Sequence, residues 1–327
     1  MKVLILGGTG VISGAVVREA SAAGAELTVV TRGTSSAGGT PPGVSFATGD
    51  IRTSSVVEDL LARENYDVAI DFLAFTPAHV AQDIEWFRNR VGQFVFISSA
   101  SAYQTPPLRL PITESTPLRN PYWEYSRDKI ACEDLLIEEY RESGFPVTVV
   151  RPSHTYDGSL VPIAGGWTAV ELARSGRPVI VPDDGHSRWT LTHASDFARA
   201  FVQLLGRDDV AGDAFHITCE EAPTWREITE VLLAAAGAEA EIVQVPSAIV
   251  AAHDERMGAS IAGDKANTRI FDNTKIRDIA PGWSAQIPWA EGAREIVEWH
   301  DADPSRRVTD ERIARLLETV IAESRGL

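Results

Sequence analysis

Apolar residues follow two different periods in the first half of the chain. Short continuous apolar runs are typical of buried parallel strands, and apolar residues at helical spacing indicate helices between those runs. The predicted strands cover 2–6, 27–31, 44–48, 68–71, 94–98 and 147–151. The predicted helices cover 11–23, 54–63, 79–90 and 125–143. Strands that alternate with helices in this way predict an α/β fold built on a doubly wound parallel sheet.

A glycine-rich turn at residues 7–10, Gly-Gly-Thr-Gly, joins the first predicted strand to the first predicted helix. Without a Cβ, glycine lets the backbone turn tightly and lets a pyrophosphate approach the helix N-terminus, where amides and the helix dipole favour an anion. The full dinucleotide pattern has a third glycine where Ser13 stands, so we expect a local change in helix packing. The residues predicted to bind a dinucleotide here are Gly7, Thr9, Gly10, Val11 and Ile12.

Tyr125 and Lys129 lie four residues apart in a predicted helix. This spacing places the phenol and the ammonium on one face, so both are expected to point into the same pocket. A nearby ammonium favours the phenolate and makes tyrosine a usable proton carrier near neutral pH. Together with the glycine turn, the pair predicts an enzyme that uses a nucleotide cofactor.

Charge and composition argue against several classes of function and site. The formal net charge of −16, without a clustered basic surface, argues against nucleic-acid binding. Two cysteines far apart, Cys132 and Cys219, predict free thiols, and no cysteine or histidine spacing suggests a metal site. The chain has no cationic signal region and no apolar run of membrane length, so we expect a cytoplasmic protein without membrane attachment.

Residues 94–103, Phe-Val-Phe-Ile-Ser-Ser-Ala-Ser-Ala-Tyr, resemble the strand-end serine motif of extended short-chain dehydrogenases/reductases, the NAD-dependent epimerase/dehydratase family. The likeness extends through residues 49–52, 71–74, 151–154 and 272–275 and so covers most of the chain. It implies that Ser99 hydrogen-bonds the reacting oxygen and that Tyr125 is the general acid/base. It also implies that Lys129 lowers the pKa of Tyr125 and holds the nicotinamide ribose.

The resemblance also sets the expected domain organisation. It implies a Rossmann-like fold in which residues 1–155 form mainly the dinucleotide-binding domain. Residues 156–327 would form mainly a smaller C-terminal substrate-binding lobe, with segments that return to the first domain. Further helices are predicted at 224–236 and 308–324, and a small, polar loop beside the cofactor is predicted at 33–43.

Cofactor choice depends on the end of the second predicted strand. An acidic residue there would bind the adenosine ribose, but the chain has Thr31 and Arg32, which suit a 2′-phosphate and favour NADP(H). If Arg32 only faces solvent, it does not select NADP(H), and NAD(H) is the alternative cofactor. By resemblance, Asp50 and Ile51 border the adenine ring and Ala74 lies under the cofactor. The same resemblance adds Leu73, Pro152 and His154 to the cofactor-binding set.

Three reactions of the family share a hydride step at a carbon bearing oxygen. Sugar 4,6-dehydratases carry an Asp-Glu pair after the strand-end hydroxyl, and Ala100 with Ser101 in those places disfavours dehydration. Thr31 and Arg32 favour an exchangeable NADP(H) and therefore a net oxidoreductase acting on a sugar-like or nucleotide-sugar substrate. A redox-neutral epimerase with tightly bound NAD is the first alternative. A cofactor-sensing protein without catalysis is the second.

Substrate contacts are expected at Ser101, His154 and Arg188. His154 would orient substrate, or it would only hydrogen-bond a loop carbonyl. By resemblance, Arg188 would grip a nucleotide-sugar phosphate, and a surface salt bridge is its alternative. The partners are then a small-molecule substrate and a second copy of the chain, since the family pairs the helices at 79–90 and 125–143 across a two-fold axis.

Overall fold

A seven-stranded, wholly parallel sheet forms the centre of the larger part of the molecule in a computed structural model that describes residues 1–33 and 42–326. The strand order is β10-β6-β5-β4-β1-β2-β3. The strands are β1 (Lys2–Leu6), β2 (Glu26–Thr31), β3 (Val44–Thr48), β4 (Val68–Asp71), β5 (Gln93–Ile97), β6 (Val147–Pro152) and β10 (Ala214–Ile217). All six predicted strands are confirmed, while β10 was not predicted. Most of the loop expected at 33–43 lies outside the described residues.

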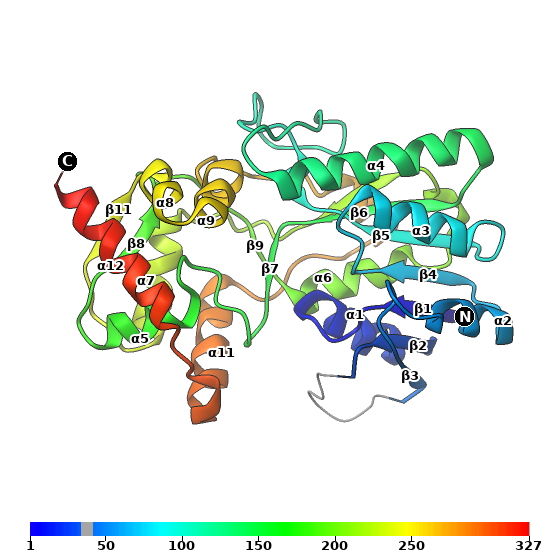
Figure 1. Cartoon of the computed structure of the whole chain (residues 1–327), viewed down its shortest axis with the longest axis horizontal. Helices are drawn as coiled ribbons and strands as arrows, with labels where there is room; N and C mark the ends of the chain where they lie inside the picture. Colours follow the sequence, from blue (N-terminus) through cyan, green and yellow to red (C-terminus); the bar gives the residue numbers. More distant parts are fainter. Residues whose placement is uncertain (34–41, 327) are drawn as a thin grey trace.

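Helices cover both faces of this sheet (Figure 1). Val3 and Ile5 pack against one layer of helices, whereas Leu4 and Leu6 pack against the other, because successive side chains of a strand point to opposite faces. The first layer contains α1 (Val11–Ala22), α6 (Ala194–Phe201) and α10 (Thr274–Ile279). The second layer contains α2 (Val56–Arg63), α3 (Pro77–Phe87) and α4 (Glu124–Ser143). Both faces are buried, which explains the continuous apolar runs of the strands.

Strand order fixes where a ligand can bind. β1 pairs with β2 on one side and with β4 on the other, so Leu6 lies opposite both Val30 and Asp71. The chain order of the strands therefore reverses at β1. In open parallel sheets, ligands bind beyond the carboxyl ends of the strands at such a reversal.

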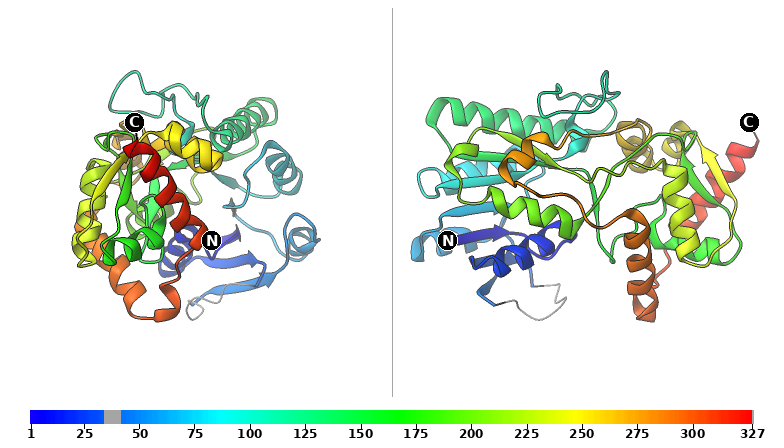
Figure 2. Two further views of the ribbon diagram at one scale, coloured as in Figure 1. Left: turned by 60° about the vertical axis from the view of Figure 1, so that its left-hand side comes forward. Right: turned by 180° about the vertical axis from the view of Figure 1, so that it is seen from behind.

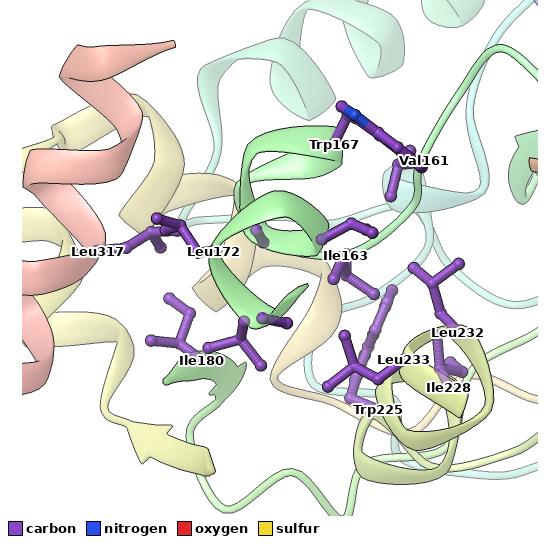
Figure 3. Close-up of a cluster of buried hydrophobic side chains, with 14 of the residues drawn as sticks. Val161, Ile163, Trp167, Leu172, Ile180, Trp225, Ile228, Leu232, Leu233 and Leu317 are labelled. Carbon is purple, nitrogen blue, oxygen red and sulfur yellow. The ribbon is translucent and has the colours of Figure 1, made fainter. Parts of the chain in front are cut away.

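The smaller part of the molecule lies beyond one end of the sheet (Figure 2). β8 (Val179–Pro182) and β11 (Ile242–Val245) form a parallel pair there. The surrounding helices are α5 (Gly166–Arg174), α7 (Trp225–Ala235), α8 (Ser247–His253), α9 (Glu255–Ser260), α11 (Trp289–Asp301) and α12 (Glu311–Arg325). Figure 3 shows part of their core, in which Trp167, Ile180, Trp225 and Leu317 belong to one buried cluster. The predicted helix at 308–324 begins instead after Asp310, whose carboxylate caps the amides of Arg312 and Ile313.

Short elements connect the two parts. β7 (His154–Tyr156) pairs with β9 (Leu191–His193) immediately after β6. A 3₁₀ turn covers Ala100–Ala102 after β5, and a π-helical turn covers Ile261–Lys265. The other 3₁₀ turns are Val202–Leu204, Asp208–Val210 and Pro304–Arg306. None of the helices among the described residues is both long enough and apolar enough to cross a membrane.

Candidate active site

A cavity of about 380 Å³ lies beyond the carboxyl ends of β1, β4, β5 and β6. It brings together the glycine turn, the end of β5 and the first turn of α4. The lining residues are Gly7, Thr9, Gly10, Val11, Ile12, Ser13, Phe72, Leu73, Phe75, Ile97, Ser98, Ser99, Tyr125, Lys129, Pro152, Ser153, Thr155 and Leu160. The three predicted catalytic residues therefore share one cavity with the predicted pyrophosphate turn.

The glycine turn is shaped by its neighbours. Gly7 has a φ of +83°, and a Cβ on Gly8 would lie 2.2 Å from Cγ1 of Val29, so larger residues do not fit there. Ser13, which stands where a third glycine was expected, accepts a hydrogen bond from the Gly10 amide at 2.9 Å. The Ser13 hydroxyl thus caps the Gly10 amide at the start of α1. The N-terminus of α1 opens onto the cavity and favours an anion.

Lys129 is held by the end of β5 and by the segment that follows β4. Its Nζ donates to the carbonyl oxygens of Ala74 and Ile97, each at 2.7 Å. The same Nζ lies 5.8 Å from the ring centroid of Tyr125. An ammonium carries three donors, so one N–H remains beside these two bonds. The spacing of four residues does bring phenol and ammonium into one cavity, as predicted.

Burial shifts the pKa values of both groups. It raises the pKa of Tyr125 to about 12, although hydrogen bonding by Ser99 lowers it, and the charge of Asp264 raises it slightly further. It lowers the pKa of Lys129 to about 8, because a desolvated ammonium is disfavoured. Within the protein alone, the pKa of Tyr125 thus moves in the opposite direction to the one expected from Lys129.

Ser99 follows β5 and begins the 3₁₀ turn at Ala100–Ala102. Its Oγ lies 2.9 Å from Oγ of Ser101 and accepts a hydrogen bond from the Ser101 amide at 3.2 Å. Ser101, predicted to contact substrate, is only 3 % exposed and does not line the cavity. It lies behind Ser99, where Ser126 also donates to its hydroxyl at 2.7 Å.

Several predicted cofactor residues lie outside the cavity. Arg32 is exposed at the end of β2, and Oγ1 of Thr31 accepts from the Gly33 amide at 3.2 Å. Asp50 is exposed and accepts from the Arg52 amide at 2.9 Å. Ile51 and Ala74 are buried, and the carbonyl of Ala74 contributes instead by fixing Lys129.

The two remaining substrate candidates also lie away from the cavity. The ring of His154 packs edge-on against Trp225 at 6.1 Å between centroids. Burial and the charge of Lys265 lower the pKa of His154 to about 3, so its imidazole is neutral. Arg188 is exposed, and its Nε donates to the carbonyl of Ala222 at 2.8 Å. Neither of the expected alternatives, a salt bridge for Arg188 or a carbonyl bond for His154, occurs among the described residues.

Sequence reasoning missed several cavity residues. Phe72 lies inside the motif at 71–74, Phe75 follows it directly, and Ser153 lies inside the motif at 151–154, so their positions next to strand ends carried a usable signal. Thr155 and Leu160 carried none. Among the described residues there is also no cluster of His, Cys, Asp and Glu that could hold a metal ion, and both cysteines are buried and unbridged.

A buried ion pair between Glu133 and Arg151 connects the elements that carry the site residues. Glu133 on α4 receives Nε of Arg151 at 3.0 Å on one oxygen and Nη2 at 2.6 Å on the other. Ser98, next to Ser99, donates to the same carboxylate. The pair therefore joins three elements of the site: the end of β5, the helix of Tyr125 and Lys129, and the end of β6.

Several known proteins match this chain in sequence. The family model described as NAD dependent epimerase/dehydratase family matches residues 3–218. The 2′-dehydrokanamycin reductase of Streptomyces kanamyceticus is 30 % identical over 289 residues, covering 86 % of this chain and 80 % of that protein. The UDP-glucose 4-epimerase of Lactobacillus helveticus is 31 % identical over 169 residues, covering 46 % of this chain and 51 % of that protein.

A solved structure shares the fold. The dTDP-glucose 4,6-dehydratase of Bacillus anthracis in complex with NAD superimposes with a TM-score of 0.74 at 19 % identity, covering 93 % of this chain and 98 % of the other. The chain is thus similar in sequence to a reductase and an epimerase, and similar in fold to a dehydratase. The family model and the reductase, which matches 86 % of the chain, show that the chain belongs to the NAD-dependent epimerase/dehydratase family of extended short-chain dehydrogenases/reductases.

Proposed function

We propose that this protein is an NAD(P)-dependent oxidoreductase that transfers hydride at a carbinol or ketone carbon of a sugar-like substrate. The observation that carries the proposal is the shared cavity of Ser99, Tyr125 and Lys129 beside the glycine turn. A protein that only sensed a cofactor would have no need for that arrangement. The reductase relative, which covers most of the chain, favours net reduction of a ketone.

The residues present fit a dinucleotide. The α1 N-terminus faces the cavity, and the absence of a Cβ on Gly8 lets the turn that leads to it pack closely on Val29, so this end suits a pyrophosphate. The remaining N–H of Lys129 suits a ribose hydroxyl. When bound, the cofactor would supply or accept the hydride at its nicotinamide ring.

The chain's own residues would handle the proton. In the reducing direction, the substrate carbon gains the hydride while the phenol of Tyr125 gives its proton to the carbonyl oxygen, which yields an alcohol. The phenolate then recovers a proton from solvent. Ser99 donates a hydrogen bond to the same oxygen and stabilises the negative charge that develops on it.

We further propose that NADP(H) is preferred, because Arg32 is exposed at the end of β2 and no described residue forms an ion pair with it. Its guanidinium suits a 2′-phosphate. The NAD bound in a related dehydratase keeps NAD(H) as the alternative. Replacement of Arg32 by Glu should weaken NADPH binding by roughly tenfold or more and leave NADH binding within a few-fold, because only NADPH carries the phosphate. Equal losses for both cofactors in calorimetry would disprove this assignment.

An epimerase is the second candidate, since a UDP-glucose 4-epimerase matches about half of the chain. A 4,6-dehydratase is disfavoured because Ala100 and Ser101 stand where acids would be needed. A homodimer formed through α3 and α4, and a cytoplasmic location, stay predictions.

The test is Tyr125→Phe in a purified protein, assayed with NADPH or NADH on 2′-dehydrokanamycin and with NAD⁺ on UDP-glucose and UDP-galactose. We expect the variant to lose turnover by about 10²-fold or more and to keep cofactor affinity. Tyr140→Phe, on the exposed side of the same helix, is the control and should keep turnover. A Tyr125→Phe protein that turns over normally would disprove the role of Tyr125. Formation of the other UDP-hexose from UDP-glucose or UDP-galactose with no net reduction of NAD⁺ would favour the epimerase.

A further inference from the structure

Three serine hydroxyls form a chain that ends at the cavity. Ser126 is fully buried on α4, Ser101 is 3 % exposed, and Ser99 lines the cavity. Oγ of Ser126 donates to Oγ of Ser101 at 2.7 Å, and Oγ of Ser101 lies 2.9 Å from Oγ of Ser99. The chain therefore connects the helix that carries Tyr125 to the strand end that carries Ser99.

The number of donors and acceptors fixes the direction of these bonds. A hydroxyl has one proton and two lone pairs. Ser101 accepts the proton of Ser126, and among the described residues its own proton has no acceptor other than Oγ of Ser99. Ser99 also accepts from the Ser101 amide at 3.2 Å. Both lone pairs of Ser99 are then occupied, so its own O–H must point away from this network and toward the cavity.

The backbone of this turn is anchored from distant parts of the chain. Nδ2 of Asn120 donates to the carbonyl of Ser101 at 2.9 Å and to that of Gly263 at 2.7 Å. Nη1 of the fully buried Arg269 donates to the carbonyl of Ala100 at 3.2 Å. Because these bonds hold the turn in place, the hydroxyl of Ser101 stays within reach of both of its serine partners.

We propose that Ser101 and Ser126 are positioning residues that make Ser99 an obligate hydrogen-bond donor toward the cavity. This inference rests on the proposed function in assigning the reacting oxygen to that cavity. A donor-only Ser99 would bind a carbonyl oxygen or an alkoxide and would not accept a proton from a substrate hydroxyl. Proton exchange with substrate is then left to Tyr125 alone.

The first test needs no substrate, because without substrate the same Ser99 O–H faces the Tyr125 phenol and its hydrogen bonding to the phenolate lowers the pKa of Tyr125. The phenolate fraction of Tyr125 is followed at about pH 11 by NMR of tyrosine labelled at Cζ, with Tyr125→Phe for assignment and circular dichroism for the fold. Ser99→Ala should raise the pKa by about one pH unit, and Ser126→Ala should raise it by part of that amount. In the Ser99→Ala background, Ser126→Ala should have no further effect.

The control is Thr229→Val, which removes a buried hydroxyl bonded to Trp225 O at 2.8 Å in the other part of the molecule and should leave the pKa of Tyr125 unchanged. An equal shift from Ser126→Ala with and without Ser99, or no shift at all, would overturn the proposal. A general structural role for Ser126 would give that equal shift.

The second test is kinetic and uses NADPH with 2′-dehydrokanamycin as the probe. Ser126→Ala should lower kcat by roughly tenfold with little change in KM, and the loss should vanish in the Ser99→Ala background. A loss of the same size in both backgrounds would contradict the proposal. If the wild-type protein reduces no ketone, the proposed function fails, but the tyrosine titration still decides whether Ser126 orients Ser99.

Discussion

Loss of the charge on Glu133 should lower the free energy of unfolding far more than loss of an equally well-paired charge on the surface. Its side chain is 4 % exposed and that of Arg151 is 6 % exposed. Nε and Nη2 of Arg151 each bond one of its oxygens, and Nε makes a second, longer bond at 3.2 Å. In Glu133→Gln, one carboxylate oxygen becomes an NH₂ group that faces a guanidinium N–H, so a bond is lost and a buried positive charge is left unpaired. Breaking a buried pair in this way costs about 3–5 kcal/mol.

The surroundings of Arg151 place the expected cost at the lower end of that range. Its guanidinium lies 4.8 Å from the ring centroid of Tyr103, and Nη1 donates to the carbonyl of Glu114 at 3.3 Å, so part of its stabilisation survives. A loss of about 3 kcal/mol corresponds to a fall in the thermal midpoint of roughly 4–5 °C for a chain of this size. Thermal unfolding followed by circular dichroism measures this fall.

The control is Asp209→Asn in the exposed pair with Arg207, which has the same two-bond geometry at 2.9 Å and 2.6 Å. Because solvent screens that pair, its midpoint should not change measurably. In Glu133→Gln/Arg151→Gln, the unpaired charge is gone and part of the loss should be recovered. If Glu133→Gln melts within about 2 °C of the wild-type protein, then burial does not control the strength of this pair.

Two further predictions concern the cofactor turn and pH. Gly8→Ala should weaken dinucleotide binding by roughly tenfold or more in calorimetry, since its Cβ would lie 2.2 Å from Val29, whereas Gly14→Ala, with 3.5 Å to its nearest neighbour, should bind normally; equal affinities would contradict the fit argument. Burial lowers the pKa of Lys129 from 10.5 to about 8, so between these values the unfolded chain holds the proton more tightly and stability rises with pH. The urea midpoint of the wild-type protein should therefore rise relative to that of Lys129→Met across this window, and a constant difference would refute the shift.

Local patterns were enough to predict six of the seven strands of the sheet and the shared cavity of Tyr125 and Lys129. Apolar runs gave the six strands, because a strand buried on both faces needs no information from distant residues. Spacing alone brought Tyr125 and Lys129 into one cavity. β10 escaped prediction because it is four residues long and joins the sheet only through its distant partner β6.

The features that the sequence did not predict depend on contacts between residues far apart in the chain. Arg269 is fully buried and donates to the carbonyls of Ala100 and Gly263, yet a lone arginine in a sequence predicts an exposed side chain. Ser126 lies inside the Tyr125–Lys129 spacing, but its role depends on the turn of Ser101, whose position is fixed from elsewhere. The pKa direction of Tyr125 depends on how deeply folding buries the phenol, which spacing does not reveal.

The pKa values of the two central groups bear on the direction of catalysis. With a pKa of about 12, Tyr125 carries its proton throughout the physiological range, as its proposed role of acid in the reduction of a ketone requires. A reduced nicotinamide is neutral and would leave that protonation state unchanged. An oxidised nicotinamide carries a positive charge, and a positive charge near a phenol favours the phenolate, which is the base needed to oxidise an alcohol. Burial of Tyr125 would therefore let the charge of the bound cofactor, more than Lys129 alone, select the protonation state that each direction requires.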